Sequence, residues 1–587
     1  MASGDQPLLY RRPSSEQTEP EEEEEEDALL TGERTQKRKT RGWKFWRELG
    51  LFTWALVTTA LVVILAVLYQ KQQPEHESPP SGKRNLIMMI SDGMGPTSLA
   101  MARSYKQFQD GLPWSEHLVL DTHLIGSSRT RSTSSLVTDS AAGATAFSCG
   151  FKSYNGAIAV LPDHSPCGTV LEAAKKAGYM TGLVVTTRIT DATPACFAAH
   201  VNLRDEEDRI AEQLIGEYPL GRVVDIMLGA GRCHFLPNTT TGSCREDSRD
   251  IVAAAKDAGF SYVDDRSGFD DLKLGKAVKL PLLGLFADHD IPYEIDRRFE
   301  NDVYPSLDEM ARTALEALSA ATKNSDKGFF LMIEGSRIDH AGHANDPAAQ
   351  VHEVLAYDTA FASALAFLER DATPGVLVST SDHETGGLSV ARQLHDAYPD
   401  YLWYPGVLAN VTHSAEHLSR AYFTWLGAHA GADATAWVRR TVAEGLGVGD
   451  ASAAEIEALA QRPDTAPYTF ADIVARRAQT GWATHGHSGA DVNIYASHPR
   501  DAQALVGNHE NTEVGDFLRT YLDVDVEAVT KELMEKGTMF DTVDEHGQTV
   551  SWMGRLPAEG ERLDGQDHLD HYSGDFKKHK RCEICGI

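Results

Sequence analysis

A serine followed by small residues is the first feature of this chain that could do chemistry. Ser140 stands in the run Thr138–Ala146, which opens with residue types that commonly begin helices. The start of a helix presents backbone N–H groups and the positive end of the helix dipole, and phosphate binds at such places. A hydroxyl held there could attack phosphorus. The same letters also describe an ordinary helix cap, so Ser140 alone leaves both interpretations open.

Three apolar runs of strand length each end in acidic or histidine residues. The first leads to Asp92, the second to Glu334, and the third to Asp382 and His383. Continuous apolar runs are typical of buried parallel strands, and open α/β sheets bind ligands at the carboxyl ends of such strands. We therefore expect these side chains to lie at one edge of a sheet. A turn aspartate is the alternative for Asp92.

Histidines at two further positions complete the spacing of a metal site. Asp339 and His343 are four residues apart, so one helical turn would direct both at a single ion. Chance clustering of charges after a strand is the alternative for this pair. His487 supplies a late imidazole, and we expect His485 to sit beside the site rather than in it.

Five motifs in this order resemble those of the alkaline phosphatase family, over roughly Leu86 to Val506. The resemblance is greatest to the membrane-anchored vacuolar enzymes of fungi. It implies an α/β fold, a three-layer sandwich with a large, mostly parallel central sheet flanked by helices. It also implies a homodimer that hydrolyses a broad range of phosphate monoesters through a phosphoserine intermediate.

The resemblance assigns roles residue by residue. Ser140 matches the nucleophile and Arg204 the arginine that holds phosphate. The first zinc site is matched by Asp339, His343 and His487, the second by Asp92, Asp382 and His383, and the magnesium site by Asp92, Thr193 and Glu334. Sets that include imidazole suit zinc, whereas an all-oxygen set suits magnesium. The implied cofactors are two Zn²⁺ ions and one Mg²⁺ ion per chain.

Two residues beside the expected sites form a mixed pair. His340 stands where bacterial members of the family have a lysine, while Asp191 is of the bacterial type. Both would border the phosphate and magnesium sites. The pH optimum and the metal preference of the third site therefore stay open.

An uncharged segment near the N-terminus predicts a membrane anchor. Leu49–Tyr69 spans 21 residues without a charge, enough to cross a bilayer as a helix. A signal peptide is the alternative, but the segment is long for one and lies well inside the chain. Basic residues precede it, which places the N-terminus in the cytosol. The chain is thus predicted to be a single-pass type II protein with a signal-anchor helix.

The predicted organisation follows from these features. We expect a disordered cytosolic tail (1–48), the transmembrane helix (49–69), a linker (70–84), one catalytic domain (85–540) and a C-terminal tail (541–587). A helical insertion at about 391–480 could be a lid, a dimer contact or simple packing. In the tail, Glu25–Leu30 has the acidic-dileucine form of a sorting signal, for which a cytosolic adaptor would be the partner. A chance Leu–Leu pair after a polyacidic run is the alternative.

Several features indicate a secretory route. Asn238 and Asn410 lie in glycosylation motifs, and all seven cysteines follow the predicted span. Cys233 could pair with Cys244 and Cys149 with Cys167, although sequence does not fix connectivity. A net charge of −31 disfavours nucleic-acid binding.

The function predicted from these features is phosphate monoester hydrolysis in the vacuolar lumen. One rival is another hydrolase of the same fold, such as a phosphodiesterase or a sulfatase, but Ser140 with Arg204 favours monoesters. The other rival is a catalytically silent luminal receptor. Complete ligand sets at three metal sites argue against it.

Overall fold

The computed structural model describes residues 41–72, 82–543 and 549–558. The predictions for the acidic-dileucine sequence and for most of the C-terminal tail lie outside these residues. The chain divides into two units, Met1–Ser78 and Pro79–Ile587, which are described separately.

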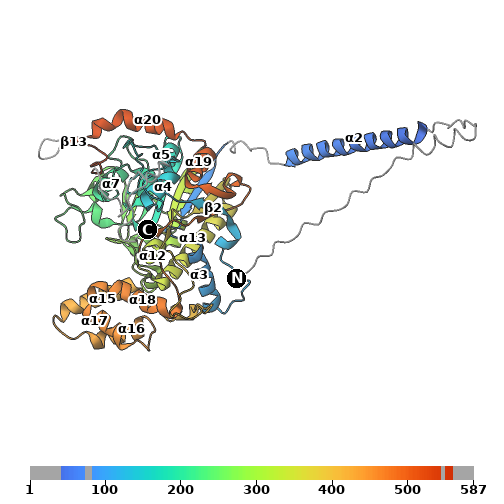
Figure 1. Cartoon of the computed structure of the whole chain (residues 1–587). Coiled ribbons are helices and arrows are strands. Elements are labelled where there is room, and N and C mark those ends of the chain that lie inside the picture. The colour runs from blue at the N-terminus through green and yellow to red at the C-terminus, as the bar shows by residue number, and fades with distance from the viewer. Residues whose placement is uncertain (1–40, 73–81, 544–548, 559–587) are drawn as a thin grey trace, which may run out of the picture. The chain divides into compact units, whose positions relative to one another are not determined.

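Helix α2 (Arg41–Gln72) is the described element of the first unit (Figure 1). Its stretch Gly42–Leu65 has a mean hydropathy of 2.0 and is, by length and composition, able to cross a membrane. The helix begins before the predicted residue 49 because charged side chains such as Lys44 and Glu48 are good helix formers. Hydropathy therefore located the uncharged centre of the helix rather than its start.

A ten-stranded sheet forms the centre of the second unit, in the order β12-β2-β11-β8-β1-β7-β3-β4-β6-β5. Strand β11 is antiparallel to both of its neighbours, and the other pairs are parallel. The predicted mostly parallel sheet is confirmed. The strands are β1 (Asn85–Ile90), β2 (Leu124–Arg129), β3 (Met180–Arg188), β4 (Ile226–Ala230), β5 (Ser261–Val263), β6 (Leu282–Leu285), β7 (Phe329–Glu334), β8 (Gly375–Thr380), β11 (Val492–Ala496) and β12 (Gly507–Glu510).

Helices cover both faces of the sheet, which gives the predicted three layers. Alternate residues of β1 enter different cores: Ile87 and Met89 pack into one, while Leu86, Met88 and Ile90 pack into the other. All five side chains are fully buried, as expected for a strand covered on both faces. The helices of this domain are α3 (Pro96–Gln109), α4 (Ser140–Cys149), α5 (Val170–Lys176), α6 (Ala192–Ala198), α7 (Glu207–Leu214), α8 (Ile251–Asp257), α9 (Arg266–Asp271), α10 (Glu294–Arg297), α11 (Leu307–Thr322), α12 (Arg337–His343), α13 (Pro347–Arg370), α19 (Asn511–Leu522) and α20 (Val526–Lys536).

Residues 405–478 form a separate group of helices, drawn in orange beside α3 and α12 in Figure 1. They are α14 (Pro405–Leu408), α15 (Ala415–Ala428), α16 (Thr435–Gly445), α17 (Ala453–Gln461) and α18 (Ala466–Ala478). Tyr422 of α15 stacks on Trp437 of α16 with ring centroids 5.1 Å apart. This group, called the helical insertion below, thus has apolar packing of its own.

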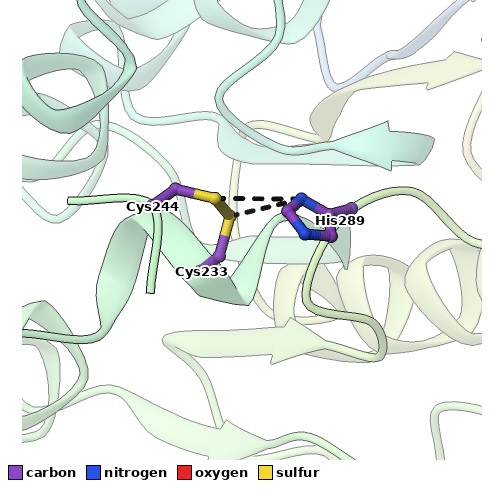
Figure 2. A group of neighbouring side chains, drawn as sticks. All are labelled: Cys233, Cys244 and His289. Carbon is purple, nitrogen blue, oxygen red and sulfur yellow. Dashed lines mark hydrogen bonds between the residues drawn. A yellow bond between two sulfur atoms is a disulfide. The ribbon is translucent and has the colours of Figure 1, made fainter. Parts of the chain in front are cut away.

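Both candidate cysteine pairs are joined as disulfides, Cys149 with Cys167 and Cys233 with Cys244. Figure 2 shows the second disulfide with the ring of His289, whose Nδ1 lies 3.7 Å and 3.8 Å from the two sulfur atoms. Because the sulfurs are bonded to each other, they cannot act as two thiolate ligands, and this group is not a metal site. The disulfide closes the loop that carries Asn238.

Candidate active site

Strand register brings three carboxylates to one edge of the sheet. Ile90 at the end of β1 pairs with Glu334 of β7 on one side and with Thr380 of β8 on the other. Asp92 and Asp382 each lie two residues beyond that pairing level. All three carboxylates are therefore brought together by the parallel hydrogen bonding of adjacent strands.

The first turn of α4 places the serine beside this edge. Ser140 is the first residue of α4, and the Asp139 side chain caps the helix by accepting the N–H of Ala142. The Oγ atom of Ser140 lies 3.1 Å from Nε2 of His383. One ligand atom each from Asp92, Asp382 and His383 lie within 4.8 Å of one another. This set coincides with the second zinc site that the resemblance implied.

A second group lies next to the first. Asp339 and His343 are on α12, with Oδ2 of Asp339 3.2 Å from Nε2 of His343. His487 arrives through the two-stranded pairing of β10 (His487–Ser488) with β9 (Glu384–Thr385). Its Nε2 is 3.1 Å from that of His343, and its ring stacks on His383 at 3.5 Å. The ring of His487 therefore contacts histidines of both groups, so the two groups are directly adjacent.

Close backbone approach makes this packing possible at Gly93. Its φ is +76°, and a Cβ built there would lie 2.6 Å from Cα of Asp339. Only glycine fits both constraints. His485 stays outside the ligand group, as expected, with its Nδ1 2.8 Å from the carbonyl oxygen of His343. The β1 turn and α12 thus meet directly behind the site.

The expected magnesium ligands also converge. Thr193 lies on α6, and its hydroxyl is 3.5 Å from Oδ2 of Asp92. Glu334, at the end of β7, is buried and interacts with both Thr193 and Asp92. The donors are two carboxylates and one hydroxyl, all oxygen, which is the set that magnesium prefers.

The electrostatics of the site call for bound cations. One oxygen each of Asp92, Glu334 and Asp382 is buried and accepts no hydrogen bond within the described part of the chain. Burial first, and then the neighbouring carboxylates, raise the pKa of Asp92 well above its usual range. Burial likewise raises the pKa of Glu334 and of Asp382. Buried carboxylates that repel one another are accommodated when cations lie between them, so the donor sets fit the implied metals.

Arg204 is held between two carboxylates. Its guanidinium lies 3.3 Å from Asp139 and 3.0 Å from Asp191. Asp191 also pairs with Arg188 at 3.0 Å, and Arg188 pairs with Asp290. His340 joins the far end of this network, since its Nδ1 is 3.6 Å from Asp290. Asp191 and His340 therefore act on the site through other side chains.

Sequence reasoning missed two residues that position the site. The helix-cap interpretation of the run Thr138–Ala146 covers one role of Asp139, yet its two oxygens contact both the start of α4 and Arg204. The Thr385 hydroxyl contacts Asp339 and lies 3.2 Å from Nδ1 of His383, so it links the two ligand groups. Thr385 follows directly after the Asp–His–Glu sequence, but nothing in its residue type marks it as special.

Comparison with known proteins identifies the family. The profile of the alkaline phosphatase family matches residues 83–524. The repressible alkaline phosphatase of Saccharomyces cerevisiae is 53% identical over 499 residues, covering 81% of this chain and 88% of the yeast protein. The chain therefore belongs to the alkaline phosphatase family, and its reaction is phosphate monoester hydrolysis.

Solved structures agree with this assignment. The alkaline phosphatase of Thermus thermophilus is 30% identical, with a TM-score of 0.64 over 79% of this chain and 98% of that one. A variant of the enzyme from the Antarctic bacterium TAB5 is 26% identical, with a TM-score of 0.52 over 75% of this chain and 98% of that one. That variant was solved with magnesium bound in its M3 site.

Proposed function

We propose that the chain hydrolyses a broad range of phosphate monoesters through a covalent phosphoserine at Ser140. The observation that carries the proposal is the position of the Ser140 hydroxyl, at the start of α4 and 3.1 Å from His383. A nucleophile there faces a phosphoryl group held by the N–H groups of the helix. Family membership supports the same reaction.

We propose two Zn²⁺ ions and one Mg²⁺ ion as cofactors. Asp339, His343 and His487 would hold one zinc, Asp92, Asp382 and His383 the other, and Asp92, Thr193 and Glu334 the magnesium. When bound, the zinc ions neutralise charge on the attacking and leaving oxygens. Magnesium in the TAB5 variant supports the third site.

The protein groups carry distinct parts of the reaction. The Ser140 hydroxyl gives its proton to water, its oxygen bonds to phosphorus, and the bond from phosphorus to the leaving oxygen breaks. The leaving oxygen takes a proton from water and departs as the alcohol. Water then attacks phosphorus, the bond to Ser140 breaks, and inorganic phosphate leaves. Arg204 would hold two phosphoryl oxygens, with Asp139 and Asp191 fixing its guanidinium.

Trapping of the phosphoserine tests the proposal. Purified full chain, saturated with zinc and magnesium and quenched in acid after a burst with labelled aryl phosphate, should retain label on Ser140. Ser148→Ala is a matched control because Ser148 is buried in the same helix, with its hydroxyl donating to the carbonyl oxygen of Thr145. Label on another residue would refute the assignment of the nucleophile. Faster release from an aryl diester than from the monoester would favour a phosphodiesterase.

We further propose that the enzyme works in the vacuolar lumen as a single-pass type II membrane protein. The apolar stretch of α2 and the basic residues before it support the anchor and its orientation. Asn238 and Asn410 are exposed and available for glycans. In sealed vesicles, the glycosylated catalytic domain should resist added protease, and its digestion would reverse the topology.

The remaining proposals concern organisation and partners. The family resemblance supports a homodimer, and sedimentation of the detergent-solubilised chain tests it.

The acidic-dileucine sequence supports binding of a cytosolic sorting adaptor. Leu29→Ala with Leu30→Ala should reroute the protein without changing phosphate release, and normal delivery of this variant would show that the motif is unused. The domain limits 1–48, 49–69, 70–84, 85–540 and 541–587 stay as proposed, and limited proteolysis can check them.

A further inference from the structure

A second cluster of metal-binding side chains lies where the helical insertion meets the sheet domain. Asp296 belongs to α10, whereas His413 and His417 flank the start of α15. One ligand atom from each residue lies within 4.8 Å of the others, the same limit that the two catalytic groups satisfy. The proposed reaction uses none of these three residues.

Hydrogen bonds across the junction fix the first turn of α15. Oδ1 of Asp296 accepts the N–H of Ser414 at 3.0 Å, and Oδ2 of Asp346 accepts the N–H of Ala415 at 2.8 Å. The Ser414 hydroxyl in turn accepts the N–H of His417. The backbone that carries the two histidines is therefore held against the sheet domain independently of any ion.

The two imidazoles lie side by side and face the carboxylate. His413 and His417 are one helical turn apart, and their rings stack at 4.3 Å with an interplanar angle of 27°. Asp296 is only 5% exposed. Donors bound to one zinc ion at about 2.0–2.2 Å lie roughly 3.3 Å from one another. Small side-chain rotations would bring these atoms from their present positions to that separation.

The tautomer of His413 suits metal binding. Its Nδ1 lies 3.0 Å from the Thr412 hydroxyl, and that hydroxyl donates to the carbonyl oxygen of Gly445 at 3.1 Å. When the hydroxyl proton is used there, Nδ1–H of His413 donates to the Thr412 oxygen. The lone pair is then on Nε2. A metal-binding histidine is commonly oriented by such a bond from its other ring nitrogen.

The donor atoms, rather than the surrounding charges, select among metals. Arg298 lies close by, with its guanidinium 3.4 Å from the carbonyl oxygen of Thr412, and the N-terminus of α15 is itself positive. Glu416 is paired with Arg337 at 2.6 Å, and Asp296 is the only carboxylate of the ligand set. A hard cation such as calcium needs more oxygen ligands than this, whereas two imidazoles and one carboxylate suit zinc.

We propose that Asp296, His413 and His417 bind a zinc ion that clamps the helical insertion to the sheet domain, with water as the fourth ligand. The ion would bridge α10 and α15, which are already joined there by the hydrogen bond from the Ser414 N–H to the Asp296 side chain. It is separate from the catalytic ions, and it restrains the insertion rather than taking part in the reaction.

Zinc content and proteolysis of the full chain test this proposal. Asp296→Asn keeps an acceptor for the Ser414 N–H, and His417→Gln keeps the helix. Each should carry about one zinc ion fewer per chain and should be cleaved several-fold faster by trypsin within residues 391–480. Phosphate release should stay within about two-fold. His429→Gln is the matched control, since His429 lies at the end of α15 and stacks on Trp425.

Three results would overturn the clamp. Unchanged zinc content in both variants would show that no ion binds there. An equal loss of zinc in His429→Gln would show that the effect follows general damage to the insertion. Restoration of trypsin resistance in the chelated wild-type chain by calcium, but not by zinc, would exclude the proposed metal.

Discussion

The two places where imidazoles meet carboxylates differ in how their ligands are held. At the catalytic edge, Asp92 and Asp382 extend from neighbouring strands whose register sets their distance. At the junction with the helical insertion, Asp296 belongs to α10 and His413 lies just before α15, and the two segments meet through hydrogen bonds between side chains and backbone such as that from the Ser414 N–H to Asp296. Ligand geometry is therefore imposed by the sheet in the first place and depends on docking in the second. Reaction chemistry belongs at the rigid place, since misplacement of about 1 Å is costly.

Removal of the nucleophile should have the largest effect at the rigid edge. We expect Ser140→Ala to lower phosphate release by several orders of magnitude while zinc content and thermal unfolding stay nearly unchanged, because the strand-end ligands keep their positions. Steady-state kinetics and elemental analysis provide the measurements. Retention of most activity would contradict the assignment of Ser140 as the nucleophile. Loss of zinc would show that the strand register alone does not hold the ligands in place.

Substitution of a metal ligand should have different effects at the two proposed metal sites. His487→Ala and Asp339→Asn should each lose about one zinc ion and nearly all activity, since a site with three protein ligands tolerates no missing one. Asp296→Asn should lose a zinc ion but keep its activity. Elemental analysis beside phosphate release distinguishes the cases. If His485→Ala alone loses the catalytic ion, the two histidines have been assigned the wrong way round.

Arg204 tests whether substrate binding can be weakened without disturbing the edge. Arg204→Ala should keep its metals but raise KM and weaken inhibition by phosphate, because a charge-assisted fork contributes about 1.5–3 kcal/mol. Arg204→Lys should recover only part of this, since an ammonium cannot form the fork. Inhibition titrations with inorganic phosphate measure the effect. Equal inhibition of Arg204→Ala and the wild-type chain would contradict the assignment.

The smallest expected effect concerns pH and the metal-free protein. Asp339 raises the pKa of His343 to about 9. The pairing of protonated His343 with Asp339 therefore stabilises the folded state fully below about pH 6.5, the pKa of histidine in the unfolded chain. This stabilisation disappears as pH rises through 9. The raised pKa of Asp92 and of Glu334 also makes the metal-free fold less stable as pH rises. The pKa of Asp339 is lowered instead, so the stability that this carboxylate contributes is lost only as pH falls below 4.

Bound metal ions should remove this loss, so the gap in Tm between metal-loaded and chelated protein should widen from pH 6 to pH 9. Calorimetry with and without chelator measures the gap. A gap that stays constant would indicate that the catalytic edge is not where the ions act on stability. In the Asp296→Asn variant, the Tm gap between metal-loaded and chelated protein should widen with pH about as much as in the wild-type chain.

Sequence predicted the edge better than the insertion for a physical reason. Apolar runs that end in Asp92, Glu334 and Asp382 predict parallel strands, and parallel strands necessarily bring their ends together. The predicted α/β fold and family were thus confirmed. Asp139 and Thr385 escaped because their roles depend on neighbours far away in sequence. Asp296 and His413 escaped for the same reason, since no periodicity indicates how an inserted helix docks.

The short pairing of β9 with β10 also has a consequence for the order in which the protein becomes active. His383 leaves the ribosome about a hundred residues before His487, and the whole helical insertion is made between them. A nascent chain can therefore complete its sheet strands from β1 to β8 while the first zinc group still lacks a ligand. Domains tend to fold as they emerge, so the helices can form in this interval. Catalytic competence thus comes late in synthesis, after most of the catalytic domain has been made.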